Sequence, residues 1–155
     1  ETDIEVGRES YKAKIFKTKK FHVNFIFLMN DQITEGLYYG DLLKYAIFLG
    51  KGCLEVLKML DINPDIVHFH DALSALACIY AKNDPFYMKE FSGVKFAFTI
   101  HNAGPAYQQI FPSERVKELN IPTLNWDKVI WKGNLNLMYA GLINSDICNT
   151  VSEVP

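Results

Sequence analysis

Two short apolar runs, each followed at once by polar residues, constrain the fold of this chain more than any other feature. Residues 66–69 and 94–100 have strand length and are separated by a helical segment. Continuous apolar runs of this kind are typical of parallel strands buried on both faces, and alternation of helix and strand indicates an α/β domain. We therefore predict a doubly wound, mostly parallel sheet with helices on both faces, in which the two runs are buried central strands.

Further elements follow from hydrophobic spacing and turn residues. We predict strands at 11–17 and 21–28 around a basic break at 18–20, a polar loop at 30–40 and a last strand at 147–151. Helices are predicted at 41–60, 72–81, 113–119 and 134–143. Asp41 and Ser113 are the expected caps of the first and third of these helices.

Composition excludes several classes of protein. The 155 residues suffice for one domain, and a net charge of −2 argues against a nucleic-acid surface, which needs a basic face. No run of 18 apolar residues occurs, so we expect no membrane span. Cys53, Cys78 and Cys148 are odd in number and lie in apolar surroundings, so we expect buried free thiols in a cytoplasmic protein.

The candidate site follows the two predicted strands. One strand continues into His70 and Asp71, and the other continues into His101 and Asn102. Ligands of open α/β sheets bind beyond the carboxyl ends of the strands, so these side chains should converge on one rim. Imidazole, carboxylate and carboxamide groups suit sugar hydroxyls, and a helix that starts at Ala72 would offer backbone N–H groups to a phosphate.

Plainer interpretations stay open at this point. His68 suits a hydrogen-bonded core residue, Asp71 could cap the next helix, and His101 with Asn102 could open a turn. Four aromatic residues could stack on sugars, although packing explains them as well: Tyr38, Tyr39, Trp126 and Trp131.

Five segments together resemble the glycogen and starch synthase family. They are PDIVHFHD (64–71), FTIHN (98–102), AYQ (106–108), GNLNLMYAG (133–141) and SDICNTVS (145–152), in the family's order and at compatible spacing. The resemblance covers about residues 42–152, whereas residues 1–41 match only in their strand-rich character.

The resemblance implies a retaining glucosyltransferase with a Rossmann-like domain that forms one half of a GT-B enzyme. Such enzymes move glucose from ADP-glucose or UDP-glucose to the non-reducing end of an α-1,4-glucan, in the cytoplasm or in the plastid stroma of plant-type organisms. The implied catalytic residues are His101 and Asp71, with no covalent nucleophile, metal or cofactor. The implied substrate-binding residues are His70, Asn102, Tyr107, Gln108, Gly133 and Asn134.

The chain also departs from the family pattern. Ala72 stands where the family has tryptophan, Gln109 replaces a glycine, Tyr139 stands where lysine is frequent, and Glu153 replaces a proline. The opening KxGGL segment and the nucleotide-binding C-terminal domain have no counterpart in the sequence. We therefore expect residues 1–155 to be a single, partial, acceptor-side domain that is inactive on its own.

Three alternatives remain. One is another GT-B glycosyltransferase with a different sugar nucleotide or acceptor. Another is a non-catalytic carbohydrate-binding protein. The third is a metal hydrolase that uses His68 and His70 together with Asp71 and His101.

Overall fold

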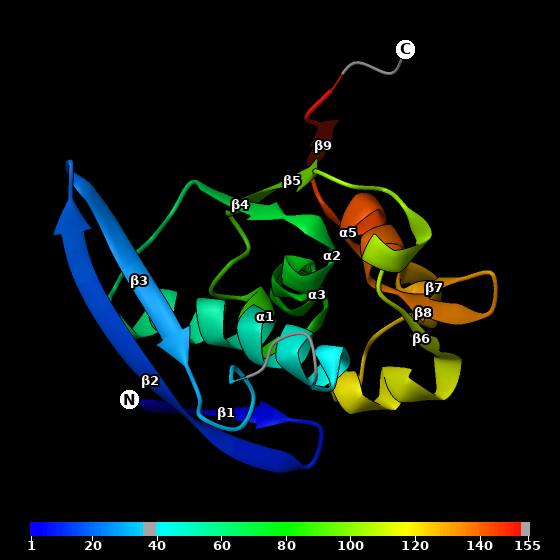
Figure 1. Cartoon of the computed structure of the whole chain (residues 1–155), viewed down its shortest axis with the longest axis horizontal. Helices are drawn as coiled ribbons and strands as arrows, with labels where there is room; N and C mark the ends of the chain where they lie inside the picture. Colours follow the sequence, from blue (N-terminus) through cyan, green and yellow to red (C-terminus); the bar gives the residue numbers. More distant parts are fainter. Residues whose placement is uncertain (36–39, 153–155) are drawn as a thin grey trace.

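A parallel sheet of three strands organises the computed structural model, which describes residues 1–35 and 40–152, and it lies along the upper side of the molecule in Figure 1. The strands are β4 (Ile66–His70), β5 (Lys95–Ile100) and β9 (Ile147–Thr150), in the order β4-β5-β9. Both neighbouring pairs are parallel, with Phe69 opposite Phe98 and Thr99 opposite Asn149. The predicted parallel pairing of the two apolar runs is confirmed.

The position of β4 differs from the prediction. Only β5 is central, because β4 has one paired neighbour among the described residues. Val67 and Phe69 face the packed side, whereas Ile66 is 62% exposed. The apolar run therefore alternates between a covered and an uncovered face, and the prediction of a buried central strand is wrong for β4.

Helices cover one face of this sheet in the described part of the chain, whereas we expected them on both. α2 (Asp71–Ser74), α3 (Leu76–Asn83) and α5 (Leu137–Asn144) lie against that face, and α1 (Leu42–Met59) packs on α3. At the crossing of α1 and α3, a Cβ on Gly50 would lie 2.9 Å from the backbone of Leu76 and Ala77, so only glycine permits this approach. Asp41 caps α1 as predicted, accepting hydrogen bonds from the N–H groups of Leu43 and Lys44.

An antiparallel meander precedes α1. It consists of β1 (Thr2–Val6), β2 (Glu9–Lys20) and β3 (Val23–Met29), of which β1 was not predicted. Residues 18–20 lie inside β2, so the predicted break there is wrong. The chain turns instead at Phe21 and His22, which have φ values of 50° and 64°. Phe21 does not signal such a turn, because left-handed backbone favours Gly, Asn, Asp and His.

A small antiparallel sheet lies beside α5. Its strands are β6 (Ile110–Pro112), β8 (Asn134–Asn136) and β7 (Ile130–Trp131), connected through the 3₁₀ segments η2 (Ser113–Leu119) and η3 (Trp126–Lys128). The helix predicted at 134–143 begins three residues later, because Asn136 caps α5 by accepting from Tyr139 N–H. Ser113 is the first residue of η2 and makes no capping bond, so that prediction is wrong.

Together these elements form a Rossmann-like α/β unit, as predicted. Among residues 1–35 and 40–152, no helix is both long and apolar enough to cross a membrane. All three cysteines are free thiols. Cys78 is buried and Cys53 is partly buried, but Cys148 is exposed on the edge strand β9, so the expectation of buried thiols is wrong for Cys148.

Candidate active site

The carboxyl ends of β4 and β5 bring three of the predicted residues into direct contact. His70 is the last residue of β4 and His101 follows β5, and their Nδ1 and Nε2 atoms lie 3.0 Å apart. Asp71 Oδ1 accepts a hydrogen bond of 2.9 Å from the backbone N–H of His101. The predicted convergence of His70, Asp71 and His101 on one rim is confirmed.

Asp71 has an unusual backbone conformation. Its φ is 58°, in the left-handed region that few residues other than Gly, Asn and Asp adopt. This conformation turns the chain out of β4 and lets the carboxylate reach across to β5. The carboxylate therefore does not cap the next helix, and the capping interpretation is wrong.

The helix that follows Asp71 is too short for the phosphate-binding role expected from its N-terminus. α2 has four residues before the chain bends at Ala75 and continues as α3. Sequence reasoning missed Ser74, whose hydroxyl accepts from His70 N–H at 2.9 Å and so fixes the turn that presents His70 and Asp71. The spacing of Ser74 four residues after His70 could have indicated this bond, because serine side chains often bond the backbone of residues three or four positions earlier.

His68 lies behind the rim on the uncovered face of the sheet. Its Nε2 is 2.7 Å from Thr99 Oγ1, and the Thr99 hydroxyl donates to Asn149 Oδ1 at 2.6 Å. Because that hydroxyl has a single proton, His68 Nε2–H must be the donor in the first bond. His68 is hydrogen-bonded as predicted, but it is exposed and not in the core.

Three imidazole rings lie close together at this end of the sheet. The His68 and His70 rings lie 4.3 Å apart, and the His70 and His101 rings lie 5.2 Å apart. The pKa of His70 is lowered, chiefly by desolvation and further by its two imidazole neighbours. A neutral imidazole can donate and accept, so His70 and a carboxylate together can bond several sugar hydroxyls.

The loop after β5 carries three more predicted residues. Asn102 Oδ1 accepts from Gly104 N–H at 2.9 Å, which is the turn-opening role considered above. Gln108 donates to Ala103 O at 3.1 Å and accepts from Asn136 Nδ2 at 3.1 Å, so it holds the loop against β8. Tyr107 is 54% exposed in the 3₁₀ turn η1 (Pro105–Tyr107) and leaves its side chain accessible to a ligand.

Gly133 and Asn134 lie elsewhere. Gly133 has a φ of 80° and forms the β7–β8 turn with Lys132, and Asn134 Nδ2 donates back to Lys132 O at 3.3 Å. No hydrogen bond in the described part of the chain connects them to the rim. The geometry explains these two residues as a hairpin turn.

The departures from the family pattern have structural consequences. Ala72 is 1% exposed, so position 72 faces the core and not the rim. Gln109 has a φ of 55° at the position where the family motif has glycine. Tyr139 stacks on Trp131 at 5.0 Å between ring centroids and donates to Asp127 O, so one face of that tryptophan is already covered. Tyr38, Tyr39 and Glu153 lie outside the described residues.

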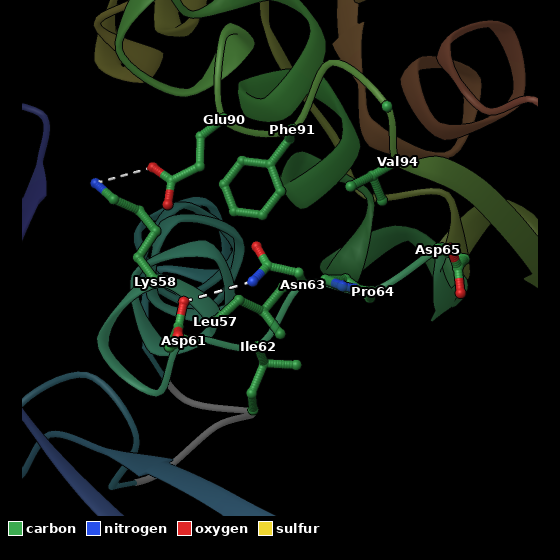
Figure 2. A pocket seen from close by; sticks show the side chains of 11 residues that line it. Leu57, Lys58, Asp61, Ile62, Asn63, Pro64, Asp65, Glu90, Phe91 and Val94 are labelled. Carbon is green, nitrogen blue, oxygen red and sulfur yellow. Dashed lines mark hydrogen bonds and ion pairs between the residues drawn. The ribbon is translucent and has the colours of Figure 1, made fainter.

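A hollow of about 280 Å³ lies at the opposite end of the sheet from the rim (Figure 2). Asp65 and Val94, which directly precede β4 and β5, line it together with the end of α1. The Lys58–Glu90 ion pair of 3.8 Å crosses its edge. Neither this hollow nor any other part of the described chain gathers three His, Cys, Asp or Glu residues suited to one metal ion. The ligand set needed by a metal hydrolase is therefore not assembled among these residues.

Comparison with known proteins assigns the family. Residues 1–154 match the family model of the starch synthase catalytic domain, so the match includes the first 41 residues, where we expected only a general likeness. A glycogen synthase of Thermosipho melanesiensis is 36% identical over an alignment of 149 positions, gaps included, that covers 89% of this chain and 30% of that protein. Glycogen synthase 2 of Geobacter metallireducens is 36% identical over an alignment of 166 positions, gaps included, that covers 97% of this chain and 33% of that protein.

A solved structure agrees in fold. The catalytic domain of starch synthase IV from Arabidopsis thaliana, bound to ADP and acarbose, has a TM-score of 0.75 at 22% identity, over 97% of this chain and 32% of that one. The chain thus spans about a third of the length of the relatives it matches. It belongs to the starch synthase catalytic domain family.

Proposed function

We propose that the protein containing this chain transfers glucose from ADP-glucose or UDP-glucose to the non-reducing end of an α-1,4-glucan, with retention. This chain supplies the acceptor-side domain. The observation that carries the proposal is the contact of Asp71 with His101 at the carboxyl ends of two parallel strands, in a member of this family. The related starch synthase IV structure holds ADP and acarbose, a nucleotide and an oligosaccharide, which supports this pairing of donor and acceptor.

The rim residues would act by position and charge. The His101 ring and the Asp71 carboxylate can bond hydroxyls of the transferred glucose and so fix its orientation. The negative charge of Asp71 would offset the positive charge that develops on the sugar as its bond to phosphate breaks. Ser74 and His70 hold these two groups in place through the turn after β4 and the 3.0 Å imidazole contact.

The direct test is a transfer assay with the full-length protein. Purified protein is incubated with radiolabelled ADP-glucose or UDP-glucose and glycogen, and label in precipitated glucan is counted. We expect incorporation that β-amylase releases, since that enzyme cuts only α-1,4 chains. Glycogen binding without incorporation from either donor would contradict the proposal and favour a non-catalytic carbohydrate-binding protein.

A further inference from the structure

A second hollow, of about 450 Å³, lies between β1, α1 and α4 (Pro85–Met88). None of these elements carries a residue of the rim. Its wall contains four carboxylates, one lysine and an exposed aromatic ring: Asp3, Glu5, Glu55, Asp84, Lys51 and Phe86. Acidic clusters of this kind are common on protein surfaces, so the lysine decides whether the hollow can be a binding site.

Lys51 lies near three of these carboxylates, Glu5, Glu55 and Asp84, without a direct bond to any of them. It is only 7% exposed, yet it lines the hollow and makes no hydrogen bond or ion pair with any residue in 1–35 and 40–152. Its ammonium lies 5.0 Å from the centre of the Tyr80 ring, a contact that satisfies none of its three N–H donors directionally. Burial lowers the pKa of this amine. No fully buried side-chain nitrogen among the described residues lacks a hydrogen-bond partner, so the ammonium of Lys51 is not sealed off from solvent. It opens into the hollow that it lines, where an oxygen of a ligand could accept from it.

The surrounding charges select the class of ligand. Four carboxylates line the hollow, and only Glu55 among them has a second lysine as ion-pair partner, Lys58 at 3.5 Å. The remaining negative charge exceeds that of the one ammonium, which disfavours a phosphate or another anion. No three of the acidic groups are placed to hold one metal ion in the described residues, and the ammonium disfavours an organic cation. A neutral polyol fits both signs, because each hydroxyl can accept from Lys51 and donate to a carboxylate.

The aromatic residues that line the hollow restrict the class of ligand further. Phe86 is 66% exposed, and its ring packs edge-on against Tyr87 at 4.9 Å. An exposed apolar ring beside several hydrogen-bonding groups matches the alternating apolar and hydroxyl surfaces of a pyranose.

We propose that this hollow is a second carbohydrate-binding site, separate from the rim, which takes a neutral oligosaccharide. That the oligosaccharide is an α-1,4-glucan rests on the proposed function. Holding one branch of a polymer here would raise the local concentration of chain ends at the rim.

The test is maltoheptaose binding to the full-length protein, measured by isothermal titration calorimetry. Lys51→Met keeps the length of the side chain and removes the ammonium, and we expect the affinity of one site to fall about tenfold or more. Lys44→Met is the matched control, since Lys44 lies two turns earlier on α1 and is paired with Glu9 at 2.8 Å on the surface. We expect the control to bind as the wild type does.

A second variant tests the same site without altering a buried side chain, so that weaker binding cannot be attributed to loss of folding. Asp3→Asn with Glu5→Gln changes two exposed side chains of β1 and should weaken the same site severalfold at unchanged melting temperature. Wild-type affinity and stoichiometry in both variants, or no maltoheptaose binding at all, would overturn the proposal. Binding that depends on Lys51 in a protein without transfer activity would support this site and contradict only the proposed function.

Discussion

Replacing Asp71 by asparagine separates the charge of this residue from its geometry. Asparagine tolerates the left-handed backbone at φ 58° and keeps an oxygen to accept from His101 N–H. A hydrogen bond to a charged group is worth about 1.5–3 kcal/mol and one to a neutral group about half of that. Stability should therefore fall by about 1 kcal/mol, or about 2–4 °C in melting temperature for a domain of this size.

Turnover should respond far more strongly than stability. If the carboxylate stabilises charge on the transferred sugar, Asp71→Asn should lower kcat about a hundredfold, equivalent to about 2.7 kcal/mol of transition-state stabilisation. The assay is glucose incorporation by the full-length protein at saturating donor and glycogen, with melting followed by circular dichroism.

Asp71→Ala is the contrasting variant. Alanine loses the bond to His101 and adds about 1–2 kcal/mol for the left-handed backbone, so stability should fall by about 3 kcal/mol. Wild-type kcat in Asp71→Asn would refute the charge argument. Equal losses of stability in the two variants would refute the backbone argument.

Three further outcomes follow from the structure. Gln109→Gly should raise the free energy of unfolding by about 0.5–1 kcal/mol in urea denaturation, because glycine removes the strain of the left-handed backbone in the folded state. The larger conformational entropy of glycine in the unfolded chain offsets part of this gain, and a loss of stability would contradict the prediction. In the folded protein at pH 8, a thiol reagent should label exposed Cys148 but not Cys53 or Cys78, since burial raises their pKa values to about 11 and about 12; equal labelling would contradict it. The pKa of the Asp146 carboxyl group is lowered, chiefly by the hydrogen bond from Lys82 of α3. The ionised carboxylate therefore stabilises the folded state fully at pH values above the unfolded pKa of about 4, and this stabilisation is lost as the pH falls through the lower pKa of the folded state. Asp146→Asn should therefore unfold less steeply with acid than the wild type, and identical acid titrations would contradict this.

The sequence predicted the elements whose signals are local. Asp41 before an apolar helix gave the start of α1, and the two apolar runs gave a parallel strand pair. The rim followed from topology alone, because residues after neighbouring parallel strands must meet at one edge.

Other features depend on long-range contacts or on backbone angles, which the pattern of apolar and polar residues in the sequence does not reveal. The Phe21–His22 turn places a phenylalanine in left-handed backbone, and β4 has a neighbour on one side only among the described residues, although Ile66 extends its apolar run. The bond from His101 N–H to Asp71 joins residues 30 positions apart, so only the folded chain distinguishes it from a helix cap. Lys51 gave no signal either, since a lysine within a helix is normally exposed.

The central claim, that the rim at β4 and β5 performs glucosyl transfer, is tested most directly by kcat of His101→Ala in the full-length protein. The ring is exposed and contacts His70, so its removal leaves no buried group unpaired, and the melting temperature should change by only a few degrees. We predict that kcat falls about a hundredfold or more, equivalent to about 2.7 kcal/mol. Wild-type kcat in this variant, or a loss of stability with normal specific activity in the folded fraction, would contradict the account.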